Sequence, residues 1–459
     1  MDTPYSIGKL NLVTDAISRN KAVVAAGQTV SAGEVILSVP SLVTSLLPKW
    51  RGKRCDLCCR NIPTRACSRC KEASYCSANC QTRAWKAHHR RVCPLLSSGF
   101  HLSHAFMSQS AEEQANADLL LSLWGLASQT AEDESWDSEE PDMALQDLAS
   151  DPIHCFKNLV LHPHARALPA LPRSLLSSHP KFLNSAWSRF DCNNFVVHNI
   201  SSLEPESGAY ALGIFPLASR CFNHSCSPNA WSAFRLRAGQ VWLEVRALEN
   251  IPSEAEVAIP YLDPVLPFRE RHLRLSQIYG FECSCKRCNL EKQLALPTLP
   301  PEGSVLLEAA VTEAVFASSE EWEMHRWGAE VLARLPASIR HEEFMKILST
   351  RFESQVHDGP YAEAWLTGRA LLALCLLMYP LNYPITGYYA AELAKACWNA
   401  YILTSEPIWI SRAKGTLQFS RGILEVAGGE EELEAAAGLT TCQTLESLIA
   451  AEPLAYPDI

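Results

Sequence analysis

The sequence predicts an α+β fold, with a β-rich core that is interrupted by a cysteine-rich segment and a helical insert and is followed by a helical C-terminal domain. Three observations support this prediction. Strand-like runs occur in two separate regions, residues 1–50 and 191–265. Cysteines concentrate in two clusters, within residues 51–95 and 266–290. Over residues 291–459, apolar side chains recur at the spacing of helices.

Length and composition are typical of a soluble globular protein. The 459 residues, 47% hydrophobic and 20% charged, allow roughly two to four structural units. The apolar run Leu371–Tyr379 is shorter than the roughly 20 residues of a membrane span, so we expect no membrane association. The N-terminus lacks the pattern of a secretion signal. The eighteen cysteines are therefore expected in a reducing compartment, the nucleus or the cytoplasm, where metal binding is commoner than disulfides.

The net charge indicates which kinds of binding partner the protein favours. A formal net charge of −10 argues against a chain built mainly to hold nucleic acid, and it favours basic partners such as lysine-rich tails. Residues 49–54 and 83–91 are locally basic, so the sequence leaves nucleic-acid binding undecided. We expect a monomer.

The N-terminal half predicts strands, then loops, then helices. Residues 22–46 alternate apolar and polar side chains, with turns at Gly27 and Gly33. Residues 51–95 hold too few apolar side chains to fold without added cross-links. Residues 96–190 are predicted as helical, notably over 111–126 and 172–190. An acidic run, Glu132–Asp142, interrupts this region, and we interpret it as a solvated insert.

The C-terminal half returns to strands and then becomes helical. Residues 191–265 predict short strands, including one over 241–245. Prolines in the stretch 294–303 mark a domain boundary. Beyond it, 361–377 and 388–401 have helical apolar spacing. Paired helices of this kind suggest a stacked, TPR-like array, although no fixed-period repeat is present.

The first cysteine cluster has the spacing of two zinc sites. Zinc takes four tetrahedral ligands, and a Cys-x2-Cys knuckle supplies two of them from one turn. Metal binding would then supply the folding free energy that this segment lacks. His89 is preferred over its neighbour His88 because it gives His-x3-Cys spacing, and Cys59 breaks the knuckle spacing. The eight candidate ligands are Cys55, Cys58, Cys67, Cys70, Cys76, Cys80, His89 and Cys93.

Tyr75, Gln81 and Trp85, in their positions among these cysteines, make the segment resemble a MYND finger. The resemblance implies interleaved sites, which pair Cys55 and Cys58 with Cys76 and Cys80. The second site then takes Cys67, Cys70, His89 and Cys93. It also implies a docking module for proline-containing peptides.

Three further elements resemble the end of a SET-domain lysine methyltransferase. They are the block Asn223-His224-Ser225-Cys226-Ser227-Pro228-Asn229, the downstream Tyr261, and Cys283-x-Cys285-x2-Cys288. Their order and spacing agree, and with the finger they make the chain resemble the SET-and-MYND (SMYD-type) family. The resemblance implies a SET domain split by the finger and the helical insert. It also implies transfer of a methyl group from S-adenosylmethionine to a lysine-containing protein substrate.

The resemblance also implies residue roles. Tyr261 stands where the family has its catalytic tyrosine, and Phe195 and Tyr279 would line the lysine channel. Cofactor contacts would come from Arg19, Lys21, Asn193, Asn223, His224, Tyr261 and Phe281. A third zinc ion needs a fourth ligand beside Cys283, Cys285 and Cys288, and Cys226 is the natural candidate. The plainer alternatives are that Cys226 is a small buried residue and that these aromatic residues only pack in the core.

Two departures from the family's pattern suggest a second hypothesis. Arg19-Asn20-Lys21-Ala22 stands where the family has a Gly-x-Gly turn, whose glycines let the backbone approach the cofactor. Pro260 precedes Tyr261 and removes one backbone donor. The alternative to an enzyme is therefore a non-catalytic adaptor that binds protein partners through the finger and the helical domain.

Overall fold

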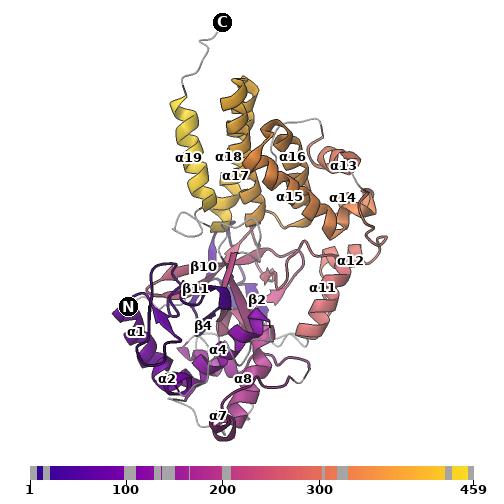
Figure 1. Ribbon diagram of the computed structural model, residues 1–459. Helices are drawn as coiled ribbons and strands as arrows, with labels where there is room; N and C mark the ends of the chain where they lie inside the picture. The colour runs from indigo at the N-terminus through magenta and orange to yellow at the C-terminus, as the bar shows by residue number, and fades with distance from the viewer. Residues whose placement is uncertain are drawn as a thin grey trace.

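The computed structural model describes residues 8–13, 21–97, 110–128, 136, 150–164, 166–198, 208–301, 305–317, 329–428 and 437–452. Strands and the cysteine-rich segment form one part of the molecule, and a set of long helices forms the other (Figure 1). This mixture confirms the predicted α+β class.

Short strands in small sheets build the β-rich part. The first sheet pairs β1 with β2, the second has the order β10-β11-β3, and the third has the order β4-β8-β7, all antiparallel. Gly27 and Gly33 have φ of +76° and +83°, a conformation that favours glycine, as expected for turns. The strands of these sheets are β1 (Leu10–Val13), β2 (Lys21–Val24), β3 (Val35–Pro40), β4 (Val43–Leu46), β7 (Asn194–His198), β8 (Ala209–Ile214), β10 (Ala230–Arg237) and β11 (Gln240–Ala247).

A parallel pair brings distant segments together beside this core. Strand β9 (Asn223–His224) pairs with β12 (Ala258–Ile259). Next to it, the N–H of Val257 donates to Ala22 O at 2.9 Å, and the N–H of Val24 donates to Ala255 O at 3.0 Å. The polar block of residues 223–229 thus pairs with residues 258–259, and the segment just before them, residues 255–257, bonds to β2.

The cysteine-rich segment has little regular structure. Its hairpin pairs β5 (Arg65–Ala66) with β6 (Ser74–Tyr75), and the helix α1 (Ala78–Ala84) follows. Ser77 caps α1 by accepting a hydrogen bond from the N–H of Cys80 at 3.1 Å. A π-helical turn, η2 (Trp85–His89), then leads into α2 (Arg90–Ser97).

Helices of the insert cover the β4-β8 side of the core. The helix predicted over 111–126 is α4 (Ala111–Ala127), which begins with a capping box of Ser110 and Glu113. A short helix, α6 (Pro152–Lys157), follows. The stretch predicted over 172–190 forms two helices, α7 (Arg173–Ser178) and α8 (Pro180–Asn193), because Pro180 begins a new helix.

The acidic run lies outside the described residues except for Trp136. This side chain is buried, with its ring 4.6 Å from that of Phe182 and 6.4 Å from that of Phe156. At this one position, therefore, the chain is not part of a solvated insert.

Helices and their connections form the described residues of the C-terminal domain, as predicted. Its helix α16 has the length and hydropathy of a membrane span, but 78% of it is buried, as in the core helix of a helical array. Within the β-rich part, α10 (Pro216–Cys221) joins β8 to β9. The helices that follow the strands are α11 (Phe268–Arg274), α12 (Lys286–Glu291), α13 (Val305–Phe316), α14 (Ala329–Arg334), α15 (Glu342–Asp358), α16 (Tyr361–Met378), α17 (Pro384–Thr404), α18 (Pro407–Gly428) and α19 (Ala437–Ala451). The single turns η1 (Pro48–Trp50), η4 (Leu275–Tyr279) and η5 (Ala337–Arg340) complete the set.

Direct hydrogen bonds join the C-terminal domain to the β10-β11-β3 sheet. The indole of Trp231 donates to Ala427 O at 3.0 Å, and the guanidinium of Arg235 donates to Gly428 O. The amide of Asn382 donates to Leu248 O at 2.6 Å. The end of α18 therefore rests on the sheet (Figure 1).

Candidate active site and metal centres

The finger assembles a first set of four sulfur atoms. Cys55 and Cys58 meet Cys76 and Cys80, and all four Sγ atoms lie within 4.8 Å of one another. The Sγ atoms of Cys58 and Cys76 are 3.7 Å apart, and those of Cys76 and Cys80 are 3.6 Å apart. Four sulfurs around zinc, each at about 2.3 Å, lie roughly 3.8 Å from one another, so this set fits a zinc ion.

A second set of ligands includes a histidine. Cys67, Cys70, His89 and Cys93 form it, and Nε2 of His89 lies 3.6 Å from Sγ of Cys70. Burial lowers the pKa of His89 to about 4, which keeps the ring neutral and able to bind a metal. His89 joins this set and the adjacent His88 does not. Both sets are the ones that the interleaved pattern implies.

Cys59 takes no part in either set. Its thiol lies 4.0 Å from Oγ1 of Thr44 in β4. Burial raises the pKa of Cys59 to about 12, so the thiol stays protonated. This placement agrees with the break in knuckle spacing.

The third set joins two segments that are far apart in the sequence. Cys226 meets Cys283, Cys285 and Cys288, again with all Sγ atoms within 4.8 Å of one another. Hydrogen bonding from Cys226 lowers the pKa of Cys285 to about 5, which favours the thiolate that zinc binds. We call these four residues the third metal centre. The four thiols fit a tetrahedral zinc ion as the finger's sets do.

His224 connects the third metal centre to Tyr261. The backbone N–H of Tyr261 donates to Nδ1 of His224 at 2.9 Å. Since a backbone N–H can only donate, Nδ1 is an acceptor, and the neutral ring carries its proton on Nε2. Nε2 lies 3.2 Å from Sγ of Cys226, so the imidazole donates to that sulfur.

Aromatic rings gather around Tyr261. Its ring centroid is 4.9 Å from that of Tyr279 and 5.4 Å from that of His224, and Phe281 lies 6.2 Å from His224. The Tyr261 hydroxyl donates to Phe222 O at 2.6 Å. Desolvation raises the pKa of Tyr261, so the phenol is neutral at physiological pH.

Asn223 and Asn229 fix the polar block to the segment that leads into β12. Nδ2 of Asn223 donates to Oε1 of Glu256 at 2.9 Å. Nδ2 of Asn229 donates to Glu256 O at 2.9 Å, and its Oδ1 accepts from the N–H of Ala258 at 2.9 Å. These bonds hold β9 and β12 in register.

Asn193 and Phe195 leave α8 on the other side of the site. The Asn193 amide donates to Val160 O at 2.8 Å and to Arg189 O at 2.7 Å, and Asn193 O accepts from the hydroxyl of Ser219. The ring of Phe195 packs 5.7 Å from that of Phe215. Phe195 and Tyr261 contact the same apolar core.

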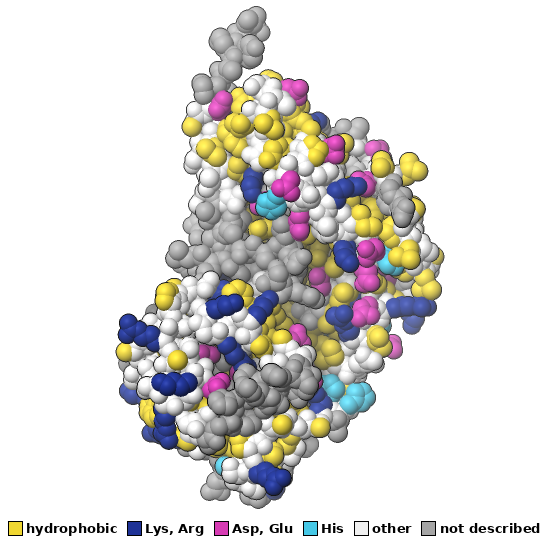
Figure 2. Space-filling model, viewed as in Figure 1, with side chains coloured by type: hydrophobic (Ala, Val, Ile, Leu, Met, Phe, Trp, Pro, Cys, Tyr) yellow, Lys and Arg dark blue, Asp and Glu magenta, His cyan; other side chains and the backbone are white. Residues whose placement is uncertain are grey.

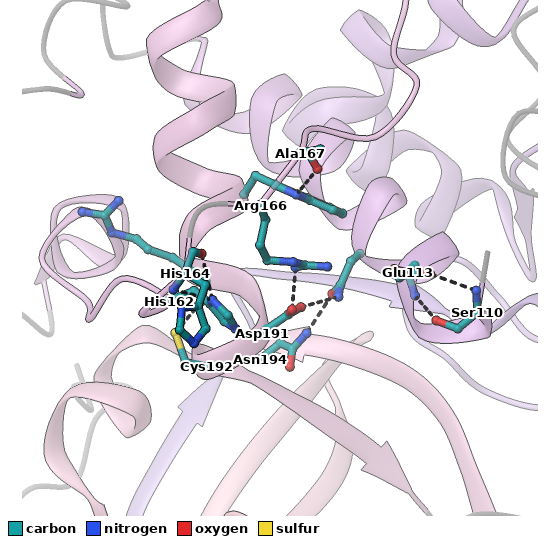
Figure 3. A network of polar contacts seen from close by, with 12 residues as sticks. Ser110, Glu113, His162, His164, Arg166, Ala167, Asp191, Cys192 and Asn194 are labelled. Carbon is teal, nitrogen blue, oxygen red and sulfur yellow. Dashed lines mark hydrogen bonds and ion pairs between the residues drawn. The ribbon is translucent and has the colours of Figure 1, made fainter. Parts of the chain in front are cut away.

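A network around Asp191 fixes the end of α8 (Figure 3). The guanidinium of Arg166 lies 2.6 Å from Oδ2 of Asp191, and Nδ2 of Asn116 donates to Oδ1 at 3.1 Å. Asn194 then donates to Oδ1 of Asn116 at 2.7 Å. The network sets the point from which Asn193 and Phe195 leave the helix.

Both departures from the family's pattern fall next to this site. Lys21 and Ala22 lie in β2 beside residues 256–257, whereas Arg19 and Asn20 lie outside the described residues. Pro260 follows Ile259, the last residue of the parallel pair, so the strand pairing loses no hydrogen bond there. The next N–H, from Tyr261, is satisfied by His224.

Sequence reasoning missed several residues. The acceptor of Asn223, Glu256, stands among other acidic residues without a distinguishing motif. Arg166, Asp191 and Asn116 come from separate elements, and no spacing relates them. The break between α7 and α8 does have a signal in the sequence, Pro180, because proline is unfavourable inside a helix.

Comparisons with known proteins agree with these features. The sequence profile of the MYND finger family matches residues 55–93. Mouse histone-lysine N-methyltransferase SMYD3 is 26% identical over 383 residues, which span 79% of this chain and 82% of that protein. N-lysine methyltransferase SMYD2-B of Xenopus laevis is 26% identical over 269 residues, 58% of each chain. Histone-lysine N-methyltransferase ASHR2 of Arabidopsis thaliana is 29% identical over 301 residues, 61% of this chain and 72% of that protein.

Proposed function

Because the chain belongs to the SET-and-MYND (SMYD-type) family, we propose that it is an enzyme that transfers methyl groups from S-adenosylmethionine to lysine side chains of proteins. The observation that carries the proposal is the convergence of Asn223, His224 and Tyr261 at the parallel pair of β9 and β12. These residues come from sequence positions almost 40 apart, and the fold places them within hydrogen-bond distance of one another or of shared neighbours.

The chemistry requires a neutral, aligned amine. S-adenosylmethionine, when bound, would supply an electrophilic methyl group on a sulfonium. The lysine nitrogen would bond to the methyl carbon as the carbon–sulfur bond breaks, which leaves a neutral thioether and a methylated ammonium that can lose a proton to water. The hydroxyl of Tyr261 donates its hydrogen bond to Phe222 O, so the phenol oxygen can still accept a hydrogen bond from an N–H of the amine. The carbonyl of Phe222 and this phenol together can orient the lysine.

The surrounding residues suit the two ligands. Aromatic side chains wall the region around Tyr261, and in this proposal Tyr279 and Phe195 form the lysine channel. In this proposal Asn223 and His224 hold the adenosyl moiety through the backbone of β9, because both ring nitrogens of His224 are already bonded. Phe281 supplies an aromatic face beside the His224 ring. Cofactor contacts of Arg19, Lys21 and Asn193 belong to the proposal as well.

Partners follow from the finger and from surface charge. We propose a proline-containing peptide as the ligand of the finger and a monomeric state in the nucleus or the cytoplasm. Figure 2 shows Lys and Arg side chains over the lower left of the molecule, near the place of α1 and α2 in Figure 1. Nucleic-acid binding there stays a prediction. The adaptor hypothesis is not favoured, because Pro260 leaves the contacts of Tyr261 and His224 intact.

The first experiment measures the binding of S-adenosylmethionine by titration calorimetry to the zinc-loaded full chain. We expect binding in the micromolar range, and a clear loss of affinity in Asn223→Ala. A folded, zinc-loaded protein that binds no cofactor would contradict the proposal and restore the adaptor.

The second experiment separates cofactor binding from chemistry. Tyr261→Phe removes one hydroxyl, so it should abolish methylation of a lysine-rich substrate while cofactor binding remains. Tyr401→Phe removes the same group from a ring in α17, where the hydroxyl donates to Oε1 of Glu452 at 3.1 Å, and serves as the matched control, with activity retained. Full methylation by Tyr261→Phe would show that the phenol is not required.

A further inference from the structure

A buried arginine contacts the third metal centre. Arg271 is fully buried, and its Nε donates to Sγ of Cys226 at 3.2 Å. One terminal nitrogen donates to Leu266 O, and the other donates to Oε2 of Glu291. Each nitrogen of the guanidinium therefore has an acceptor, and one of these acceptors is a metal-ligand sulfur.

The charges around this arginine partly offset the charge of the third metal centre. A zinc ion with four thiolates carries a net charge of about −2, which is costly to bury without a compensating cation. Arg271 and Arg287 both bind the buried carboxylate of Glu291, with Nε of Arg287 2.9 Å from Oε1. The three side chains together contribute one net positive charge beside the cluster.

The same residues tie the centre to two other parts of the molecule. Arg271 lies in α11, which continues directly into η4 and Tyr279. Nη1 of Arg287 donates to Met378 O at 2.7 Å, at the end of α16 in the C-terminal domain. On the other side of Cys226, His224 holds the backbone of Tyr261. The sulfur of Cys226 is thus the common acceptor between the helix of Tyr279 and the segment of Tyr261.

We propose that Arg271 is a positioning residue of the third metal centre, whose hydrogen bond to the Cys226 thiolate slows the loss of zinc and holds the helix that carries Tyr279. A donor to a coordinated thiolate offsets its charge and fixes its direction, and groups in this position change metal affinity about 10–100-fold. The proposal depends on zinc at this centre but not on methyl transfer, so its failure and that of the proposed function are distinguishable.

The test measures zinc release from the full chain after addition of excess chelator, without cofactor or substrate. A zinc indicator follows the release, and the phase that is missing in Cys285→Ser belongs to the third centre. In Arg271→Met we expect that phase to be about 10–100-fold faster, with the phases of the finger unchanged.

Arg235→Met is the matched control. Arg235 is equally buried, and like Arg271 it binds a buried glutamate and a backbone carbonyl, but it lies in β10 and these two partners, Glu244 and Gly428, are not metal ligands. We expect its zinc-release phases to equal those of the unmodified protein. The proposal is wrong if Arg271→Met releases zinc at the unmodified rate, or if Arg235→Met accelerates the same phase equally.

A measurement on the unmodified protein covers the case in which Arg271→Met does not fold. In the full chain with isotope-labelled arginine, replacing zinc by cadmium should shift the Nε–H resonance of Arg271 and leave that of Arg235 in place. The reason is that, of these two groups, the Nε–H of Arg271 donates to a metal-bound sulfur. Equal or absent shifts would overturn the proposal.

Discussion

The finger and the third metal centre use the same ligand chemistry in opposite ways. All eight ligands of the finger lie within residues 55–93, and they hold together a segment that has little regular secondary structure. The third centre takes one ligand from the polar block and three from a segment almost 60 residues later. The first arrangement stabilises a local module. The second connects two parts of the candidate active site.

This difference explains what each zinc ion supports. Loss of an ion from the finger should unfold residues 55–93, which lie outside the parallel pair next to Tyr261. At the third centre, Cys226 is two residues from His224, which binds the backbone of Tyr261. Metal there therefore supports the candidate cofactor site itself, and the following predictions test that distinction.

The largest effect is expected from removing ligands. Cys283→Ser should lose one zinc ion and all measurable binding of S-adenosylmethionine, because a structural zinc site contributes on the order of 10 kcal/mol to folding. Cys70→Ser, the matched change in the finger, should also lose one ion but keep cofactor binding. Metal analysis and calorimetry on both variants check this. Equal loss of cofactor binding in the two variants would remove the distinction.

A second prediction concerns the β10-β11-β3 sheet, where buried arginines are neutralised by a carboxylate rather than by a metal centre. Glu244 is buried against Arg235, Arg237 and Arg246, at 3.3, 2.7 and 2.9 Å. Glu244→Gln leaves these cations without a counter-charge, so the free energy of unfolding should fall by about 3–5 kcal/mol at neutral pH. Denaturant unfolding with zinc present measures it. The control is Glu425→Gln, because Glu425 forms an exposed ion pair with Arg421. We expect little change in its free energy of unfolding.

The stability difference between the unmodified protein and Glu244→Gln should depend on pH with a definite sign. Burial raises the pKa of Glu244, but the three arginines lower it more, to below the ordinary value of 4.5. A carboxyl with a lowered pKa in the folded state stabilises the protein above the unfolded value, and this contribution is lost as the pH falls through the folded pKa. The stability difference between the unmodified protein and Glu244→Gln should therefore be constant above pH 4.5 and shrink in stronger acid. A difference that grows on acidification would contradict the sign.

The smallest effect concerns how the finger attaches to the core. The guanidinium of Arg54 lies 4.9 Å from the ring of Trp50 and 4.2 Å from that of Tyr210. Arg54→Met should lower the free energy of unfolding by about 1–2 kcal/mol and leave zinc release from the finger unchanged. Lys49→Met is the control, because Lys49 approaches the same Trp50 from an exposed position at 5.9 Å. Faster zinc release in Arg54→Met would mean that the finger depends on its attachment.

The same contrast governs what could be predicted from the sequence. Ligands of the finger follow from spacing alone, since a knuckle is a local structure, and His89 follows from its distance to Cys93. Cys226 was predicted because the SET motif contains it. The donors to its sulfur were not predicted, because Arg271 reaches it only after α11 has packed. A buried guanidinium has no distinguishing mark among the chain's exposed ones.

Side-chain orientation was likewise beyond prediction. The position of Asn193 was expected from the resemblance, but its amide donates to Val160 O and Arg189 O, contacts that depend on how α8 ends. Trp136 was assigned to a solvated run because its neighbours are acidic, and yet its ring is buried against Phe182. Local composition cannot anticipate a single anchor of this kind. The contacts of Arg19 stay a prediction.

The spread of ligands along the chain also sets an order of events during synthesis. The finger can take up its metal once residue 93 has left the ribosome, while most of the SET domain is still missing. The third centre must wait for residue 288, and the sheet gains its contact with Ala427 later still. Domains that emerge first generally fold first. We therefore expect a nascent chain to acquire its zinc ions in two stages, with the candidate cofactor site as the later one to form.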